Sequence, residues 1–133
     1  MLDATTTDIQ PFTAKGKWIL VHGLSDELIS NQGSVNYYNS LVQKFGQQKV
    51  DGFLRFYTIP GFAHGAGDFN ASGGLPVLEA LEGWVESNNA PGNLVVTDAN
   101  TPSRTRLMCL YPMYPKYKGT GDINSAASFD CTN

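Results

Sequence analysis

The hydrophobic positions in the first half of the chain alternate between continuous runs and a helical stripe. Residues 18–21 and 53–59 are continuous apolar or aromatic runs, the pattern of strands buried on both faces of a parallel sheet. Residues 31–45 carry apolar side chains at helical spacing, with Ser30 as the N-cap and Gly46 as the stop. The pattern therefore predicts a strand, a helix and a second strand in this order.

A glycine-rich loop, a further helix and a third strand are expected after the second strand. Residues 62–74 hold few apolar anchors, and Pro76 suits the first turn of a helix that runs to about Ser87. Residues 94–97 form a short apolar run that fits a third strand. The alternation of strands and helices favours an α/β fold with a parallel sheet and right-handed crossovers.

The last part of the chain differs in composition from the part before it. Residues 98–133 are rich in Pro, Tyr, Gly, Asn and Ser, and we interpret them as an irregular tail packed on the core. The expected organisation is a core over residues 1–97 followed by this tail. A chain of 133 residues is long enough for one domain with a hydrophobic core.

The expected sheet leaves one hydrophobic edge without a neighbour. Residues 18–21 are too apolar for a strand exposed at the edge of a sheet. We therefore interpret the chain as the C-terminal part of a larger α/β sheet. Missing chain, a partner subunit or a second copy of this chain would cover the edge, so a homo-oligomer is one expected state.

The charge balance and the hydropathy exclude two classes of partner. The formal net charge is −3, and the basic residues are too scattered to neutralise several phosphates, so no nucleic acid is expected. No apolar run approaches the ~20 residues of a membrane span, so no membrane is expected. The N-terminus lacks the apolar region of a signal peptide, and a secreted parent protein would carry its signal further upstream.

Cys109 and Cys131 form either one disulfide or two buried free thiols. A bond between them would close a loop of about 23 residues and contribute roughly 3 kcal/mol to stability. The segment between them is poor in aliphatic residues and cannot pack a core of its own. This composition favours the disulfide, and with it an oxidising compartment.

Two candidate catalytic residues, Asp26 and His64, each follow an apolar run, with the helix of residues 31–45 between them. Acid followed by histidine is the order of the last two members of a Ser–Asp–His triad in an α/β-hydrolase. The acid would orient the histidine, and the histidine would act as general base and then as general acid. The alternatives are a turn or capping role for Asp26 and an ordinary surface-loop histidine.

The nucleophile of such a triad is not visible. No Gly-x-Ser-x-Gly elbow occurs in the chain. Ser25 is the nearest candidate, but Glu27 stands where the second glycine belongs and would obstruct the turn. His22-Gly23 resembles the start of an oxyanion-hole motif, which belongs upstream of the nucleophile, so we interpret His22 as structural.

Two other kinds of site have weaker support. The metal alternative would use four ligands, namely His22, Asp26, His64 and Asp68, but no close His or Cys pairing supports it, and no metal is expected. Asn70-Ala71-Ser72 is a glycosylation sequon whose use depends on a secretory eukaryotic source.

Several stretches taken together resemble the tannase and feruloyl esterase family, over essentially the whole chain. They are residues 18–30, 37–41, 55–67, 80–86, 109–112, 117–122 and 129–131. The resemblance implies an α/β-hydrolase that cleaves carboxylic esters of aromatic acids through a serine acyl-enzyme. It implies that Asp26 is the triad acid, that His64 is the triad base and that Cys109 pairs with Cys131. With the oxidising compartment that the disulfide favours, we expect a secreted or periplasmic parent protein.

The chain departs from the family in two ways. Many members place a cysteine after the triad histidine, whereas this chain has Gly65, so its upstream partner also differs or the histidine is held differently. The serine, the oxyanion donors and the lid domain of the family are absent. Calcium, which members often bind in that lid, is therefore not expected here, and no cofactor is expected in this chain.

The resemblance therefore predicts an esterase in which this chain supplies only the acid and the histidine. The isolated chain is predicted to be inactive, and the serine would come from a missing N-terminal part or from a second chain. Two alternatives are an inactive fragment or pseudoenzyme domain that associates through its open sheet edge, and an unrelated small α/β binding module.

Overall fold

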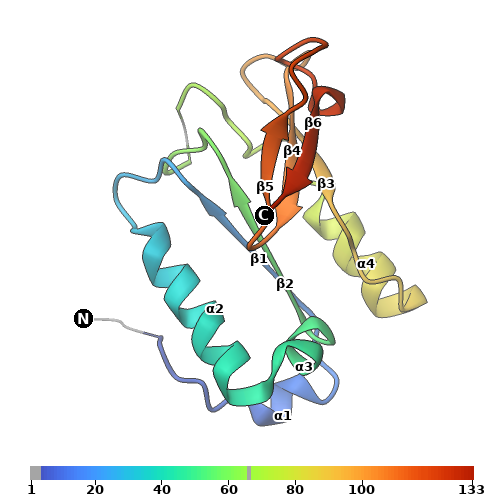
Figure 1. Cartoon of the computed structure of the whole chain (residues 1–133). Coiled ribbons are helices and arrows are strands. Elements are labelled where there is room, and N and C mark those ends of the chain that lie inside the picture. Colours follow the sequence, from blue (N-terminus) through green and yellow to red (C-terminus); the bar gives the residue numbers. More distant parts are fainter. Residues whose placement is uncertain (1–3, 66) are drawn as a thin grey trace.

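The protein has a mixed α/β fold with two sheets. The computed structural model describes residues 4–65 and 67–133, in which four strands form a main sheet in the order β1-β2-β4-β3 and two more form a second sheet (Figure 1). The strands are β1 (Trp18–Gly23), β2 (Leu54–Ile59), β3 (Leu94–Thr97), β4 (Thr105–Leu110), β5 (Tyr114–Tyr117) and β6 (Phe129–Thr132). The helices are α1 (Gln10–Thr13), α2 (Asn31–Phe45), α3 (Gln47–Asp51), α4 (Val77–Ser87) and the 3-10 helix η1 (Ala126–Ser128).

The strand–helix–strand unit predicted from the first half of the chain is present. β1 and β2 pair in parallel, and α2 connects them over residues 31–45, as its apolar stripe predicts. Gly46 ends α2 with a φ of 81°, a left-handed value that glycine adopts without strain. Ser30 occupies the N-cap position but makes no side-chain capping hydrogen bond.

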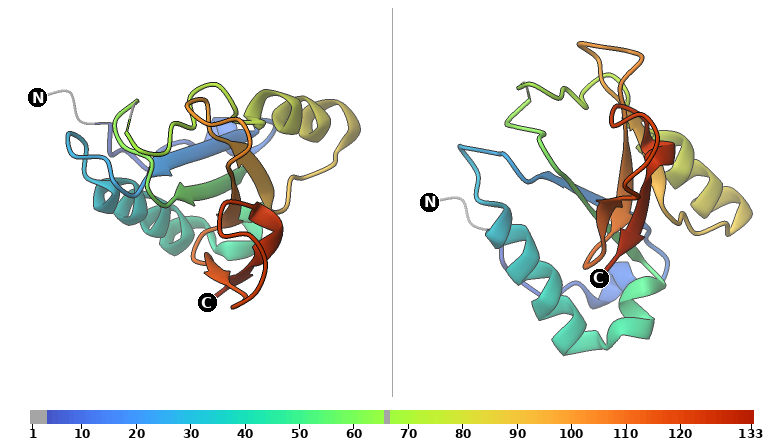
Figure 2. Two further views of the ribbon diagram at one scale, coloured as in Figure 1. Left: turned by 90° about the horizontal axis from the view of Figure 1, so that it is seen from above. Right: turned by 45° about the horizontal axis from the view of Figure 1, so that its top comes forward.

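The core is divided between the two faces of the sheet, which α2 and α4 cover from opposite sides (Figure 2). Successive residues of a strand point to opposite faces, and β2 shows this most clearly. Phe56 belongs to the buried cluster that includes Leu41 of α2, whereas Tyr57 belongs to the cluster that includes Met108 of β4. Both faces of β2 are therefore buried.

The C-terminal part is not the irregular tail expected from its composition. β4 lies between β2 and β3 in the main sheet and is antiparallel to both, and β5 and β6 form an antiparallel pair. Residues 107–110 of β4 are a short apolar run inside an otherwise polar segment, so the composition of the whole segment concealed the strand. The main sheet is consequently mixed, although β3 still runs in the same sense as β1 and β2.

β4 bears on the expected division of the chain into a core and a tail at residue 97. It lies beyond residue 97, yet it pairs with strands that precede this residue. The division into a core over 1–97 and a tail over 98–133 stays a prediction. The disulfide favoured by the sequence is present between Cys109 of β4 and Cys131 of β6, with Cα atoms 5.6 Å apart.

β1 lies at an outer edge of the main sheet, as the sequence led us to expect. It pairs with β2 on one side, and no strand of the described residues pairs with its other side.

None of the helices in residues 4–65 and 67–133 has both the length and the hydrophobicity that a membrane crossing requires.

Candidate functional site

The turn after β1 and the loop after β2 meet because the two parallel strands end side by side. Gly23 of β1 is in register with Ile59 of β2. A side chain at Gly23 would overlap the carbonyl oxygen of Phe62, so only glycine permits this close approach. The backbone N–H of Ser25 donates to the same Phe62 carbonyl at 3.0 Å. The two segments that carry the candidate residues are therefore hydrogen-bonded to each other.

Asp26 and His64 are in direct contact, as their positions after neighbouring strands predict. Nδ1 of His64 lies 3.0 Å from Oδ2 and 3.2 Å from Oδ1 of Asp26. The carboxylate is nearly buried, with 11% of its side chain exposed, whereas 48% of the imidazole is exposed. The acid is thus sheltered behind a histidine whose ring reaches the surface.

The turn that follows Asp26 keeps its carboxyl group ionised. The backbone N–H groups of Ile29 and Leu28 donate to Oδ1 at 2.8 and 2.9 Å. The hydrogen bond from Ile29 lowers the pKa most, partial burial opposes it, and the hydrogen bond from His64 lowers it further. The resulting pKa of Asp26 is about 2, against an ordinary value of 3.8.

An ionised carboxylate determines which nitrogen of His64 carries the proton. Asp26 can only accept a hydrogen bond, so Nδ1 of His64 donates. In the neutral ring Nε2 then has a free lone pair, and within the described residues no hydrogen bond to Nε2 is found. This is the arrangement in which an imidazole accepts a proton from a hydroxyl group.

His22 supports the turn that carries Asp26. Its Nε2 lies 3.1 Å from the carbonyl oxygen of Ile29, which can only accept, so Nε2 donates. Its Nδ1 lies 2.7 Å from Oγ of Ser34, which donates to it in the neutral ring. Nε2 is also 3.7 Å from the carboxylate of Asp26. These contacts fit the structural role that the sequence suggested for His22.

The remaining candidates do not join the pair. Ser25 is exposed and held through its backbone, and Asp68 forms an ion pair with Arg104 at 2.9 Å. In residues 4–65 and 67–133 no group of three or more His, Cys, Asp or Glu side chains could hold a metal ion. Gly65 has a φ of 77°, so a cysteine at this position would be strained.

Three charged residues contact the segments that carry the site but were not among the candidates drawn from the sequence, where Glu27 was noted only as an obstacle to the turn at Ser25. Glu27 accepts a long hydrogen bond from the backbone N–H of His64, at 3.5 Å. Asp98 is fully buried and pairs with Arg104, and both contact the loop that carries His64. Asp98 directly follows β3, as Asp26 closely follows β1, so the pattern of an acid after an apolar strand could have drawn attention to it.

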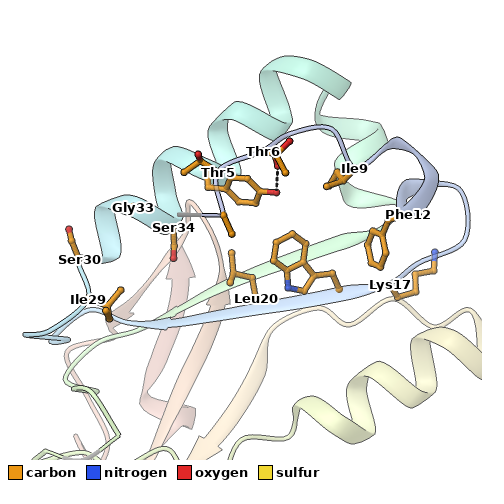
Figure 3. A pocket seen from close by; sticks show the side chains of 13 residues that line it. Thr5, Thr6, Ile9, Phe12, Lys17, Leu20, Ile29, Ser30, Gly33 and Ser34 are labelled. Carbon is orange, nitrogen blue, oxygen red and sulfur yellow. Dashed lines mark hydrogen bonds between the residues drawn. The ribbon is translucent and has the colours of Figure 1, made fainter. Parts of the chain in front are cut away.

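An apolar groove of about 940 Å³ lies beside the candidate pair. It runs between β1, α2 and the N-terminal segment, and Figure 3 shows Leu20, Phe12 and Ile9 along it with Ile29 at one end. Neither Asp26 nor His64 lines the groove. Ile29 belongs to both places, because its side chain lines the groove and its N–H donates to Asp26.

Comparisons with known proteins agree with one another. A family model described as "Tannase and feruloyl esterase" matches residues 1–132. An uncharacterised esterase of Agrobacterium fabrum is 42% identical over 137 residues, which cover 100% of this chain and 24% of that protein. A mono(2-hydroxyethyl) terephthalate hydrolase of Piscinibacter sakaiensis is 36% identical over 135 residues, which cover 96% of this chain and 22% of that protein.

A solved structure of a feruloyl esterase is similar to this chain in fold as well. The crystal structure of feruloyl esterase B from Aspergillus oryzae superposes with a TM-score of 0.83 at 30% identity, covering 96% of this chain and 29% of that chain. The chain therefore spans about a quarter of the length of the curated relatives that it matches.

Proposed function

Because the chain belongs to the tannase and feruloyl esterase family, we propose that it forms the acid- and base-bearing part of a carboxylic ester hydrolase. The observation that carries the proposal is the contact of 3.0 Å between Nδ1 of His64 and the ionised carboxylate of Asp26. Esters of aromatic acids are the proposed substrates, since the named relatives include a feruloyl esterase and a terephthalate ester hydrolase.

In the proposed reaction a serine from outside this chain attacks the carbonyl carbon of the ester. Nε2 of His64 removes the proton from the serine hydroxyl group, and Asp26 stabilises the imidazolium that forms. The same proton then passes to the departing alcohol oxygen, which leaves an acyl-enzyme. A water molecule, deprotonated by His64, attacks the acyl carbon. The bond to the serine oxygen breaks, this oxygen takes the proton back from His64, and the acid is released. These steps use no cofactor bound to this chain.

The serine would belong to a part of the protein that packs against β1 and the adjacent groove. Within the described residues β1 has one free edge, and apolar side chains line the groove beside it. The relatives are about four times longer than the matched region, so they contain ample chain for this role. That part is either an upstream segment of the same polypeptide or a separate subunit.

A disulfide is typical of proteins outside the cytosol, and we propose secretion or a periplasmic location.

A second candidate function is a catalytically inactive domain that associates through the same edge. The free edge of β1 within the described residues and the apolar groove beside it would serve such an association as well. Such a domain would retain the fold and the contact between Asp26 and His64 but would not assemble with a nucleophile.

The first experiment replaces the matching quarter of the Agrobacterium fabrum esterase by this chain. The chimaera and the isolated chain are assayed on a hydroxycinnamate ester and a nitrophenyl ester, with the intact Agrobacterium protein as the reference. We expect turnover by the chimaera and none by the isolated chain. In the chimaera Asp26→Asn and His64→Ala are each expected to lower kcat by on the order of 10⁴.

Glu82→Gln, on an exposed position of α4, is the matched control and should leave turnover unchanged. Turnover that survives both Asp26→Asn and His64→Ala would show that the pair has no catalytic role. A folded chimaera without any turnover, beside an active reference protein, would favour the inactive domain.

A further inference from the structure

Asp98, directly after β3, is a buried carboxylate whose two oxygens are both occupied. Its side chain is fully buried. Oδ1 accepts the backbone N–H groups of Asn70 and Asn100 at 3.0 and 2.9 Å. Oδ2 accepts Nε of Arg104 at 2.7 Å and lies 2.6 Å from its Nη2. Burial raises the pKa of Asp98, but these hydrogen bonds outweigh it, and the net pKa is lowered.

Arg104 extends this ion pair to the loop that carries His64. Its Nη1 donates to Oδ2 of Asp68 at 2.9 Å, and its Nη2 donates to the carbonyl oxygen of Asp68. The guanidinium also lies over the ring of Phe69, 5.5 Å from the ring centre. Phe69 is buried, with 2% of its surface exposed. Arg104 therefore holds both the backbone and the apolar anchor of this loop.

A second set of hydrogen bonds continues toward His64. Nδ2 of Asn100 donates to the carbonyl oxygen of Gly67 at 3.1 Å. The backbone N–H of Ala99 donates to the carbonyl oxygen of Asn70 at 2.7 Å. Oγ of Ser72 donates to the carbonyl oxygen of Gly65, the residue next to His64, at 3.0 Å. The contacts thus extend from β3 to the neighbour of the candidate base.

The loop needs such anchors because its own sequence does little to restrict it. Residues 61–74 contain five glycines, counting both end residues, and glycine restricts the backbone least of all residues. About half of the His64 side chain is exposed, so packing does not determine its orientation. We propose that Asp98 and Arg104 are positioning residues, whose ion pair holds the loop so that Nδ1 of His64 faces Asp26. The inference rests on the proposed role of that pair.

The two histidines of the chain make the proposal measurable by NMR. Long-range ¹H–¹⁵N spectra of the 133-residue chain show which ring nitrogen carries the proton, at about pH 8 where an ordinary imidazole is neutral. We expect the Nδ1–H form for His64 and the Nε2–H form for His22. In Arg104→Gln the His64 ring should shift toward a mixture of both forms, while His22 is unchanged. Hydrogen exchange of the backbone N–H of Asn70, which donates to Asp98, should become on the order of tenfold faster or more.

Arg106→Gln is the matched control. Arg106 also lies over Phe69, but its side chain donates to the carbonyl groups of Thr105 and Ile123 and not to the loop. The control should keep His64 in the Nδ1–H form. If Arg104→Gln unfolds the chain, which loss of the His22 signals would reveal, two milder variants take its place. Asn100→Ala, which removes the two side-chain hydrogen bonds of Asn100, and Arg104→Lys, which keeps the charge but loses the guanidinium geometry, are expected to give a smaller shift of the same kind.

Two negative outcomes have different meanings. A wild-type chain in which His64 lacks the Nδ1–H form would overturn the contact with Asp26, and with it both the proposed function and the positioning role. A wild-type chain that has this form, together with folded Arg104 and Asn100 variants that retain it in full, would overturn the positioning role alone.

Discussion

The carboxylate of Asp26 is ionised chiefly because of the turn in which it lies. The backbone N–H of Ile29 contributes most to its low pKa, and the hydrogen bond from His64 contributes less. His22 holds the same turn through the carbonyl group of Ile29. Residues next to Asp26 in the chain therefore keep its carboxylate ionised, and this negative charge orients the imidazole of His64.

We expect a carboxyl ¹³C titration to give Asp26 a pKa of about 2, and a value still below 3.8 in His64→Gln. Because the pKa of the folded state lies below that of the unfolded chain, the ionised group stabilises the fold fully above about pH 3.8. This contribution is lost as the pH falls through about 2, and Asp26→Asn should remove this part of the pH dependence. An ordinary pKa in His64→Gln would contradict the role of the backbone.

At the scale of elements, β4 and the disulfide determine how the C-terminal segment joins the core. β4 pairs with β2 and β3, and its Cys109 is fully buried. The bond to Cys131 connects this central strand to β6, so the second sheet is anchored to the middle of the first. The stretch between the two cysteines has few aliphatic side chains that could pack against the core, which is why a covalent link matters here.

Reduction of the disulfide is expected to lower the free energy of unfolding by about 3 kcal/mol, because the closed loop restricts the unfolded chain. Urea denaturation of the oxidised chain, the reduced chain and the double variant Cys109→Ala/Cys131→Ala measures this difference. The reduced chain is the closer comparison, since it keeps both sulfur atoms. Equal midpoints for oxidised and reduced chains would show that the bond does not contribute to stability.

At the scale of the whole molecule, no strand of residues 4–65 and 67–133 pairs with the side of β1 that faces away from β2. The N–H of Trp18 donates to the carbonyl oxygen of Phe53, just before β2, and the N–H of Leu24 donates to that of Ile59, the last residue of β2. By alternation the N–H groups of Ile19 and Val21 point to the free edge. Apolar side chains around the Asp26 turn are also exposed, among them Leu28 with 69% of its surface. An exposed strand edge and an exposed apolar groove both favour association with other protein surfaces. We therefore expect a partner segment to pack here.

Amide hydrogen exchange tests this expectation within one strand. In the isolated chain Ile19 and Val21 should exchange at least about tenfold faster than Leu20 and His22, which face β2. In the chimaera with the Agrobacterium protein all four amides should be protected. Protection of Ile19 and Val21 in the isolated chain, together with a doubled molecular mass, would instead assign the edge to a second copy.

The elements around the candidate pair differ in how well local sequence predicts them. The apolar stripe of α2 gives its bounds, and the runs of β1, β2 and β3 give the strands, because each pattern is contained within one element. β4 was concealed by the polar residues around it, and its place between β2 and β3 depends on pairing between segments far apart in the chain. A local pattern carries no information about such pairing.

The sequence by itself determined the family, the order of acid and histidine, and the apolar edge, since these depend on residue types and their succession. Only the tertiary structure decided that Asp26 and His64 touch, that Gly23 permits the approach, and that Asp98 and Arg104 hold the loop. The physical reason is that a hydrogen bond requires its two atoms to lie about 3 Å apart, and folding alone brings together atoms from distant parts of a chain.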